Sequence, residues 1–259
     1  MKIATWNVNS VKVRTAHLVD WLKLAEPDVV CLQELKCLDE AFPRLEVEAL
    51  GYRVSTRGQK TYNGVAVITR APHQVVLDHL PGDDADDQAR YLEVDVAGVR
   101  VASLYLPNGN PIGTEKFSYK LGWMDRLRQR AEELLAQEIP FILAGDYNVA
   151  ENDGDVWDPA DVADDALVQP ETRAAWQRLN WLGLTNAYRA FHHEEGRFSW
   201  WDYRAGGWQK DRGMLIDHLL LSPEAADLLV EADIDRRPRG WEKASDHTPV
   251  WCRLDLAAA

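Results

Sequence analysis

Cysteine is scarce in this sequence of 259 residues, which contains only Cys31, Cys37 and Cys252. Their odd number and the lack of any Cys-X-X-Cys spacing argue against a disulfide framework or a zinc finger. No apolar run approaches the ~20 residues that a membrane-spanning helix needs, and the first ten residues lack the apolar core of a signal peptide. We therefore expect a cytoplasmic protein that does not associate with membranes.

Basic residues are also few: the sequence has 29 Lys and Arg against 42 Asp and Glu, which gives a formal net charge of −13. Such a chain is not expected to coat DNA or an anionic membrane by bulk charge, although a local basic groove remains compatible with it. No low-complexity segment or Gly/Ser linker divides the sequence. Since 46% of the residues are hydrophobic and 27% are charged, we expect residues 1–259 to form a single globular domain.

Short apolar and β-branched runs predict many strands. They cover residues 3–8, 28–32, 52–56, 64–69, 74–77, 91–96, 100–105, 141–144, 215–221 and 248–254. Helical periodicity or an initial proline predicts helices over 14–25, 116–137, 170–182 and 223–229. This mixture favours an α/β fold in which two mixed β-sheets pack together with helices outside.

Charged segments between these elements are expected to be solvated. The acidic stretches 83–87 and 153–165 are interpreted as surface loops, because closely spaced like charges repel one another. Basic residues gather in 53–60, 116–130, 197–212 and 236–243. Duplex binding would need several of them on one face, but those of 126–130 are also explained as solvated charges on an amphipathic helix.

Polar side chains recur where the predicted apolar strands end. They include Asn7, Asn9, Glu34, Tyr105, Asn108, Asp146, Asn148, Asp246 and His247. Open α/β architectures build their sites at such ends, yet each residue taken alone is also explained as a turn, cap or solvated residue. Asp217 is harder to explain in that way, because a carboxylate inside an apolar strand needs a partner if the strand is buried.

Electrostatics limits what could hold these carboxylates together. Two carboxylates about 4 Å apart repel by about 4 kcal/mol at an effective dielectric of 20, so a cluster needs protons, a cationic side chain or a metal ion. Oxygen ligands favour Mg²⁺ or Mn²⁺ over zinc. His247 is expected to pair with Asp217, which would fix its orientation. Together these groups suit phosphoryl transfer to water.

Six motifs in order carry a family resemblance. They are IATWNVNS at 3–10, LQELK at 32–36, YLPNG at 105–109, AGDYN at 144–148, IDH at 216–218 and SDH at 245–247. With FSWWDYR at 198–204 and DRG at 211–213, the whole chain resembles the exonuclease III family of AP endonucleases, of the endonuclease/exonuclease/phosphatase superfamily, and its bacterial branch in particular. The resemblance implies a four-layered α/β sandwich, DNase I-like, with the site at one end of the two sheets.

The same resemblance implies roles for individual residues. It makes Glu34 the principal metal ligand, with Asn7 and Asp246 beside it as direct or water-mediated ligands. Asp146 would activate or orient the attacking water, held by Asn148. The full set of candidate metal ligands is Asn7, Glu34, Asp146, Asn148, Asp246 and His247.

Further positions would contact the substrate. His247, paired with Asp217, would contact the scissile phosphate, and the Tyr105 phenol would support the phosphate or the leaving group. Whether one or two metal ions take part is left open, because mechanisms in the family differ. Asn9 stands where some relatives carry an acid, so a second ligand at that position also stays open.

DNA contacts are expected outside the catalytic cluster. Trp200 and Met214 match positions that frame an extrahelical abasic sugar, Ile216 would line the same pocket, and Lys36 is a candidate phosphate contact. Packing on an aromatic ring contributes ~1–3 kcal/mol. The alternative is that Trp200 and the other tryptophans of 200–208 belong to the core or to a hairpin.

The function implied is that of a DNA-repair nuclease that depends on Mg²⁺, or on Mn²⁺. It would cleave the phosphodiester 5′ to abasic sites in duplex DNA and trim 3′ ends as a 3′→5′ exonuclease, acting as a monomer. Two alternatives remain. One is a phosphatase of the same superfamily that acts on small phosphorylated molecules or lipids, and the other is a DNA-binding module without catalysis. A pure binder has no need to crowd acids near phosphate, which disfavours the last.

Overall fold

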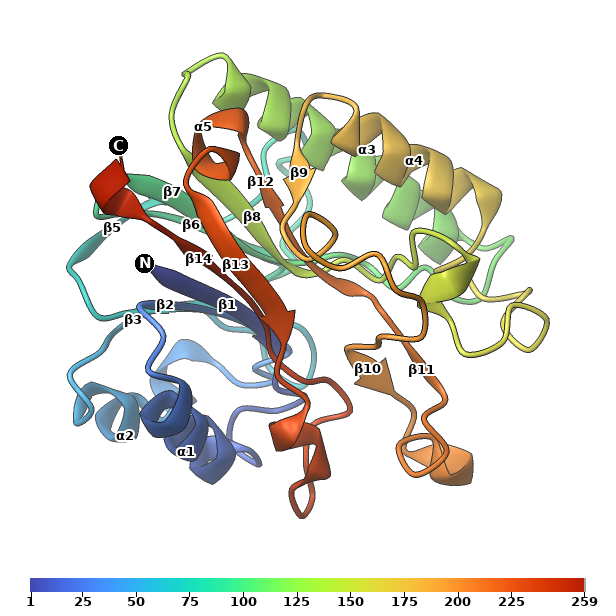
Figure 1. Ribbon diagram of the computed structural model, residues 1–259, viewed down its shortest axis with the longest axis horizontal. Helices are drawn as coiled ribbons and strands as arrows, with labels where there is room; N and C mark the ends of the chain where they lie inside the picture. Colours follow the sequence, from blue (N-terminus) through green and yellow to red (C-terminus); the bar gives the residue numbers. More distant parts are fainter. Residues whose placement is uncertain (259) are drawn as a thin grey trace.

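The computed structural model describes residues 1–258 and shows two β-sheets packed face to face (Figure 1). The first sheet has the order β13-β14-β1-β2-β4-β3. Its strands are β1 (Lys2–Asn7), β2 (Val29–Gln33), β3 (Arg53–Arg57), β4 (Val65–Thr69), β13 (Leu229–Ile234) and β14 (Val250–Leu254). The second sheet has the order β5-β6-β7-β8-β12-β9. Its strands are β5 (His73–Leu77), β6 (Tyr91–Val96), β7 (Val99–Tyr105), β8 (Phe141–Asp146), β9 (Thr185–Asn186) and β12 (Asp217–Leu221).

Both sheets are mixed, as the sequence predicted. The pairs β1–β2 and β7–β8 are parallel, and every other pair in the two sheets is antiparallel. All residues of β2 and β4 are buried, because strands covered on both faces have no solvated side. The core between the sheets consists of aliphatic side chains such as Val67, Val101 and Ile142.

Helices cover the outer face of each sheet and complete four layers (Figure 1). The first sheet carries α1 (Thr15–Ala25) and α2 (Arg44–Glu48), and the second carries α3 (Glu115–Leu135) and α4 (Pro170–Asn180). On α1, the indole of Trp21 packs edge-on against Trp6 of β1, with ring centroids 5.7 Å apart. This arrangement confirms the four-layered sandwich that the family resemblance implied.

Some expected elements are shorter than the sequence suggested. The helix predicted over 223–229 is only α5 (Pro223–Ala226), because Leu229 already pairs with Leu254 as the first residue of β13. The helices α3 and α4 each end two residues before the predicted position. The hairpin of β10 (Trp200–Trp201) and β11 (Gly213–Met214), like α2 and β9, is too short to give a periodic signal. Short 3-10 helices span Asp39–Ala41, Asp153–Asp155, Arg204–Gly206, Arg237–Gly240 and Leu256–Ala258.

The expectation of fully solvated acidic loops was wrong in part. Asp86 accepts hydrogen bonds from the Tyr119 phenol and from Arg126, so that this arginine of α3 is not a solvated charge. Asp155 is completely buried and pairs with Arg189. In both loops an arginine from another part of the chain supplies the positive charge that the loop itself lacks. Within residues 1–258, no helix has both the length and the apolar character needed to cross a membrane.

Candidate active site

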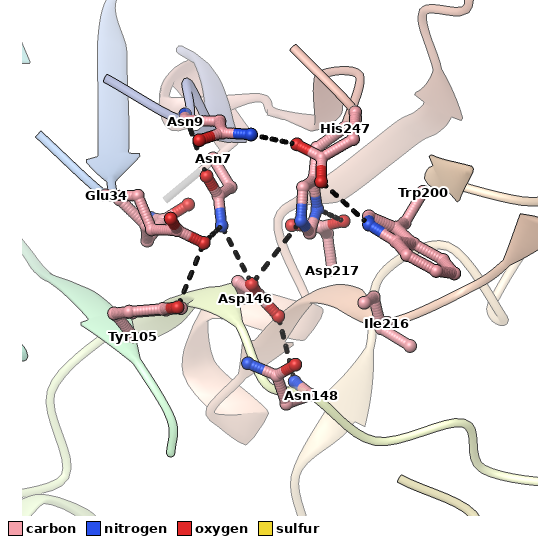
Figure 2. Close-up of polar contacts among 12 residues, drawn as sticks. Asn7, Asn9, Glu34, Tyr105, Asp146, Asn148, Trp200, Ile216, Asp217 and His247 are labelled. Atoms are coloured by element: carbon pink, nitrogen blue, oxygen red, sulfur yellow. Dashed lines mark hydrogen bonds and ion pairs between the residues drawn. The ribbon is translucent and has the colours of Figure 1, made fainter. Parts of the chain in front are cut away.

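Strand register places the first group of polar residues side by side at one end of the second sheet. Asp146, the last residue of β8, lies opposite Tyr105 at the end of β7 and opposite Asp217 at the start of β12. Since β12 is antiparallel to β8, its first residue lies at the same edge as the last residue of β8. In the first sheet, β1 ends at Asn7 beside the end of β2, and Glu34 follows directly. Figure 2 shows that these side chains converge.

The buried amide of Asn7 joins the two sheets at this edge. Its Nδ2 donates to Oε1 of Glu34 and to Oδ2 of Asp146, each at 2.9 Å. The phenol of Tyr105 donates to the same Oε1 of Glu34, also at 2.9 Å. Burial, with the charge of Glu34 next, holds the pKa of Tyr105 well above its ordinary value. The phenol is therefore a neutral hydrogen-bond donor, and two uncharged donors hold the Glu34 carboxylate toward Asp146.

His247 stands between two carboxylates. Its Nδ1 lies 2.8 Å from Oδ2 of Asp217, and its Nε2 lies 3.6 Å from Oδ2 of Asp146. The hydroxyl of Ser199 donates to the same Asp217 oxygen at 2.6 Å. Burial opposes the imidazolium, but the charges of Asp217 and Asp146 outweigh it and raise the pKa of His247 to about 10. The expected pairing of His247 with Asp217 is thus present, and it keeps the imidazole charged and oriented.

Asp146 carries the most perturbed carboxylate of this group. Burial, partly offset by the charge of His247, raises its pKa to about 7. Its Oδ1 accepts the backbone N–H of Asn148 at 2.9 Å. Asn148 is in turn held by its own Nδ2, which donates to the carbonyl of Leu106 at 2.9 Å. A buried carboxylate with a raised pKa, fixed by neutral donors, can accept a proton from water.

Glu34 differs from Asp146 because its pKa is lowered. Burial would raise the pKa of Glu34, but the charge and hydrogen bond of Lys36, together with the Asn7 amide and the charge of His247, outweigh burial. The Lys36 Nζ lies 2.8 Å from Oε2 of Glu34 and donates to Oδ1 of Asn9 at 2.6 Å. The expected phosphate contact by Lys36 therefore competes with two partners inside the protein.

Asp246 lies at the edge of the cluster rather than at its centre. Its carboxylate accepts hydrogen bonds from Nδ2 of Asn9 at 2.8 Å and from the indole N–H of Trp200 at 3.1 Å. Through Asn9 and Lys36 it is connected to Glu34 without touching it. An asparagine at position 9 supplies both the donor and the acceptor that this chain of contacts needs.

One pocket of about 620 Å³ is lined by several of these residues, whereas Asn7, Asn9, Lys36 and Asp217 lie outside its lining. Its floor includes Glu34, Tyr105, Asp146, Asn148 and His247, and one wall is formed by the side chains of Trp200, Met214 and Ile216. Met214 and Ile216 are 2% exposed, Trp200 is half-buried, and the neighbouring Trp201 is core. The predicted catalytic residues other than Asp217 therefore share one cavity with the predicted apolar contacts.

A metal ion would find ligands on this floor. Glu34, Asp146 and His247 each offer one ligand atom, and these atoms all lie within 4.8 Å of one another. Glu34 and Asp146 supply carboxylate oxygens, which hard divalent cations prefer. Asn7 turns its Nδ2 toward both carboxylates, and its Oδ1 accepts the backbone N–H of Asn9 at 3.0 Å. The donors present therefore fit a divalent metal ion.

Sequence reasoning missed two parts of the site. Residues 160–165, interpreted above as part of a solvated loop, form another wall of the pocket. Lys120 is fully buried and donates to the carbonyl of Asn148 at 2.6 Å. Its signal was present, because Lys120 falls in phase with Met124, Leu127 and Ala131 on the buried face of α3. A lysine on the apolar stripe of a helix needs a polar partner in the folded protein.

Comparisons with known proteins identify the family of the chain. A model of the endonuclease/exonuclease/phosphatase family matches residues 4–247. The exodeoxyribonuclease III of Haemophilus influenzae is 34% identical over 270 residues, which cover 98% of this chain and 100% of the relative. The structure of an AP endonuclease from Archaeoglobus fulgidus has 32% identity and a TM-score of 0.94, covering 99% of this chain and 100% of that one. A 3′ phosphatase from Neisseria bound to product DNA hairpin has 37% identity, a TM-score of 0.95 and the same coverage.

Proposed function

The chain belongs to the endonuclease/exonuclease/phosphatase family and, within it, to the exonuclease III and AP endonuclease group of hydrolases, and on that premise we propose a specific reaction for it. The protein is a Mg²⁺-dependent DNA-repair nuclease that cleaves the phosphodiester 5′ to abasic sites in duplex DNA. It also removes nucleotides and blocking groups from 3′ ends. Residues 1–259 act as one domain of this family.

A single observation carries the proposal, namely the continuous chain of hydrogen bonds and ion pairs that runs from Glu34 through Asn7, Asp146 and His247 to Asp217. These side chains come from both sheets; Glu34, Asp146 and His247 line one pocket, and the fully buried Asn7 and Asp217 support them from outside its lining. The relatives with such full-length similarity are described as an exodeoxyribonuclease, an AP endonuclease and a 3′ phosphatase bound to DNA. All three activities hydrolyse a phosphoester.

The reaction assigns a task to each side chain. Asp146, with its raised pKa, takes a proton from the attacking water while the N–H of Asn148 fixes the carboxylate. The water oxygen bonds to phosphorus, the bond from phosphorus to the 3′ oxygen breaks, and that oxygen takes a proton from solvent water and leaves as a hydroxyl. The imidazolium of His247, stabilised by Asp217, donates a hydrogen bond to a phosphate oxygen. The Tyr105 phenol, whose single hydrogen is donated to Glu34 in the free protein, turns to donate it to the phosphate or the leaving group.

The metal ion when bound supplies Lewis-acid stabilisation of the negative charge that develops on phosphate. Glu34 is proposed as its principal ligand, with Asn7 and Asp246 beside it. Asp146, Asn148 and, only after its imidazolium has lost a proton, His247 are further candidates. This proposal is supported by the ligand atoms of Glu34, Asp146 and His247.

The apolar wall supports the choice of substrate. An abasic site presents a sugar without a base, and flipping it out of the duplex costs least where the base is already missing. Such a sugar fits against the side chains of Trp200, Met214 and Ile216, which face the same pocket as the catalytic floor.

The test is a product analysis on labelled duplexes that carry an abasic site, a nick or a 3′ phosphate, each with Mg²⁺ and with a chelator. We expect cleavage on the 5′ side of the abasic site and trimming of 3′ ends, both lost on chelation. A soluble phosphomonoester serves as the comparison substrate. Turnover of that compound alone would favour a small-molecule phosphatase, and retention of DNA without any metal-dependent cleavage would favour a binding module.

A further inference from the structure

Lys120 connects two loops of the active site from behind. Its side chain is completely buried, and its Nζ donates to the carbonyl oxygens of Pro107 at 3.3 Å, Asn108 at 3.2 Å and Asn148 at 2.6 Å. An ammonium group has three hydrogens, and these three carbonyls accept all of them. Two of the carbonyls belong to the loop after β7 and the third to the loop after β8. One side chain of α3 thus holds both loops.

Burying the charged ammonium group of Lys120 costs folding free energy, which argues against a purely structural role for this residue. A buried cation loses its hydration, and burial lowers the pKa of Lys120 to about 7. Within residues 1–258 Lys120 forms no ion pair with a carboxylate, although Asp146 and Asp165 act on it at longer range. Elsewhere on the same face of α3, Met124 and Leu127 pack against the sheet with apolar side chains. Packing alone would be achieved at lower cost by such a residue.

The loop after β7 is shaped around the lysine. Gly109 has a φ of +87°, and a Cβ added there would lie 2.5 Å from Cδ of Lys120. Only a residue without a side chain both adopts this conformation easily and leaves the lysine its space. Gly109 and Lys120 are therefore matched to each other.

A short chain of hydrogen bonds leads from Lys120 to the reacting groups. Nζ of Lys120 holds the carbonyl of Asn148, and the N–H of Asn148 donates to Oδ1 of Asp146 at 2.9 Å. The side chain of Asn108 donates to Oδ1 of Asn148 at 3.2 Å, which ties the two loops together a second time. A shift of the Asn148 backbone would therefore move the donor that fixes the Asp146 carboxylate.

We propose that Lys120 is a positioning residue for the hydrolysis, which clamps the loops after β7 and β8 so that Asn148 holds Asp146 in its reactive orientation. The inference rests on the proposed nuclease function for its kinetic consequence. Lys120 itself touches no substrate, since it lies beneath the floor of the pocket. Catalysis is sensitive to such support because misplacement of a reacting group by about 1 Å can lower a rate by about 100-fold.

The first variant is Lys120→Met, which keeps an unbranched apolar stem and removes every donor. We expect kcat on the abasic duplex to fall by about 10- to 100-fold, while KM stays close to that of the wild type. Leu134→Ala is the matched control, because Leu134 is buried on the same helix away from the site. It lowers stability without touching either loop, so its kcat below the unfolding temperature should remain near the wild-type value.

A second pair of variants covers the case in which Lys120→Met does not fold. Gly109→Ala keeps the lysine but displaces its stem, and it should reproduce the fall in kcat. Gly113→Ala is its control, because Gly113 lies in the same loop with a φ of +74° and nothing within 4 Å of an added Cβ. It introduces the same kind of backbone strain without a clash. Normal kcat in Gly109→Ala, or equal losses in both glycine variants, overturns the proposal.

Hydrogen exchange provides a measurement that does not depend on DNA cleavage. The amide of Asn148 should exchange about tenfold faster in Lys120→Met, or in Gly109→Ala, than in the wild type and Leu134→Ala. If the wild type cleaves no DNA substrate, the proposed nuclease function fails, and exchange at Asn148 still decides whether the clamp exists. Accelerated exchange supports it, and unchanged exchange refutes it.

Discussion

The second sheet buries carboxylates in two places, and the two places differ in what surrounds the charge. Glu93 on β6 is fully buried and accepts hydrogen bonds from the Tyr91 phenol at 2.6 Å, from Arg100 at 2.7 Å and from Arg130 at 2.8 Å. Asp146 on β8 is buried as deeply, but its partners are the amide of Asn7, the backbone of Asn148 and the imidazole of His247.

The pKa values shift in opposite directions as a result. Burial would raise the pKa of Glu93, but the hydrogen bonds from Arg130, Tyr91 and Arg100 and the charge of Arg130 outweigh burial and lower the pKa. At Asp146 burial prevails, and the pKa is raised to about 7. Burial alone therefore does not mark a reactive carboxylate. The mark is a buried carboxylate without enough cationic partners, which leaves it able to take a proton or a metal ion.

The largest expected effect is on kcat, which should depend on Asp146 and not on Glu93. Asp146→Asn should lower kcat by about 10²–10⁴-fold, because an amide cannot accept a proton from water. Thermal stability should not fall, since the replacement removes a charge that burial disfavours. Single-turnover cleavage of an abasic duplex measures the effect, with Glu93→Gln as the control that keeps near-normal kcat while folded. Near-normal turnover by Asp146→Asn would refute the assigned role.

The converse experiment tests stability. Glu93→Gln leaves Arg100 and Arg130 without their buried counter-charge, which should cost about 3–5 kcal/mol of unfolding free energy. Urea denaturation at neutral pH measures it. The control is Glu231→Gln, which removes the partner of Arg253 in an ion pair whose side chains are 54% and 49% exposed and should cost less than about 1 kcal/mol. Equal losses in the two variants would contradict the comparison.

The stability difference between the wild type and Glu93→Gln should depend on pH. The pKa of Glu93 in the folded protein lies below its ordinary value of 4.5, so the unfolded chain takes up a proton first as the pH falls. The stabilisation by Glu93 is therefore complete above that ordinary value and is lost at lower pH, down through the folded pKa. The difference in unfolding free energy between wild type and Glu93→Gln should shrink over this range.

Mg²⁺ binding should also distinguish the surroundings of Asp146 from those of Glu93, through a smaller change in stability. Mg²⁺ at 100 times its Kd stabilises a folded protein by about 2.7 kcal/mol, and the thermal midpoint should rise accordingly and return on chelation. Glu34→Gln should abolish this rise because it removes the proposed principal ligand. Glu93→Gln should retain the rise in thermal midpoint, since the wild-type Glu93 carboxylate already pairs with arginines and is not a proposed metal ligand. An undiminished rise in Glu34→Gln would exclude the proposed ligand.

The smallest expected effect concerns the pocket wall. Trp200→Ala should weaken binding to an abasic duplex by ~1–3 kcal/mol, measured by fluorescence anisotropy in the presence of a chelator. Trp200→Phe keeps an aromatic ring but loses the donor to Asp246, and it should lose less affinity. Trp181→Ala is the remote control, because Trp181 is 78% exposed and lies outside the pocket. Equal losses at positions 200 and 181 would remove Trp200 from the substrate contacts.

Much of the site was readable because strands deliver their end residues to a fixed edge. Asp217 was distinguished by its place in an apolar strand, and the structure pairs it with His247 as expected. Only the family resemblance separated Trp200 from Trp201, since adjacent residues of a strand differ only in the face they occupy. Lys120 was overlooked because its three carbonyl partners lie at positions 107, 108 and 148, and no local pattern reveals them.

The sequence by itself determined which chemical groups stand at the strand ends, because the period of a strand and the polarity of its last residue are local properties. Tertiary structure alone decided which acids meet. It joined Glu34 to Asp146 through Asn7, held Asp246 at the edge of the cluster with Asn9 and Trp200, and neutralised Asp155 with Arg189. Those distances depend on how two sheets pack across a shared core, and side chains more than a hundred residues apart acquire their surroundings, and hence their pKa values, only there.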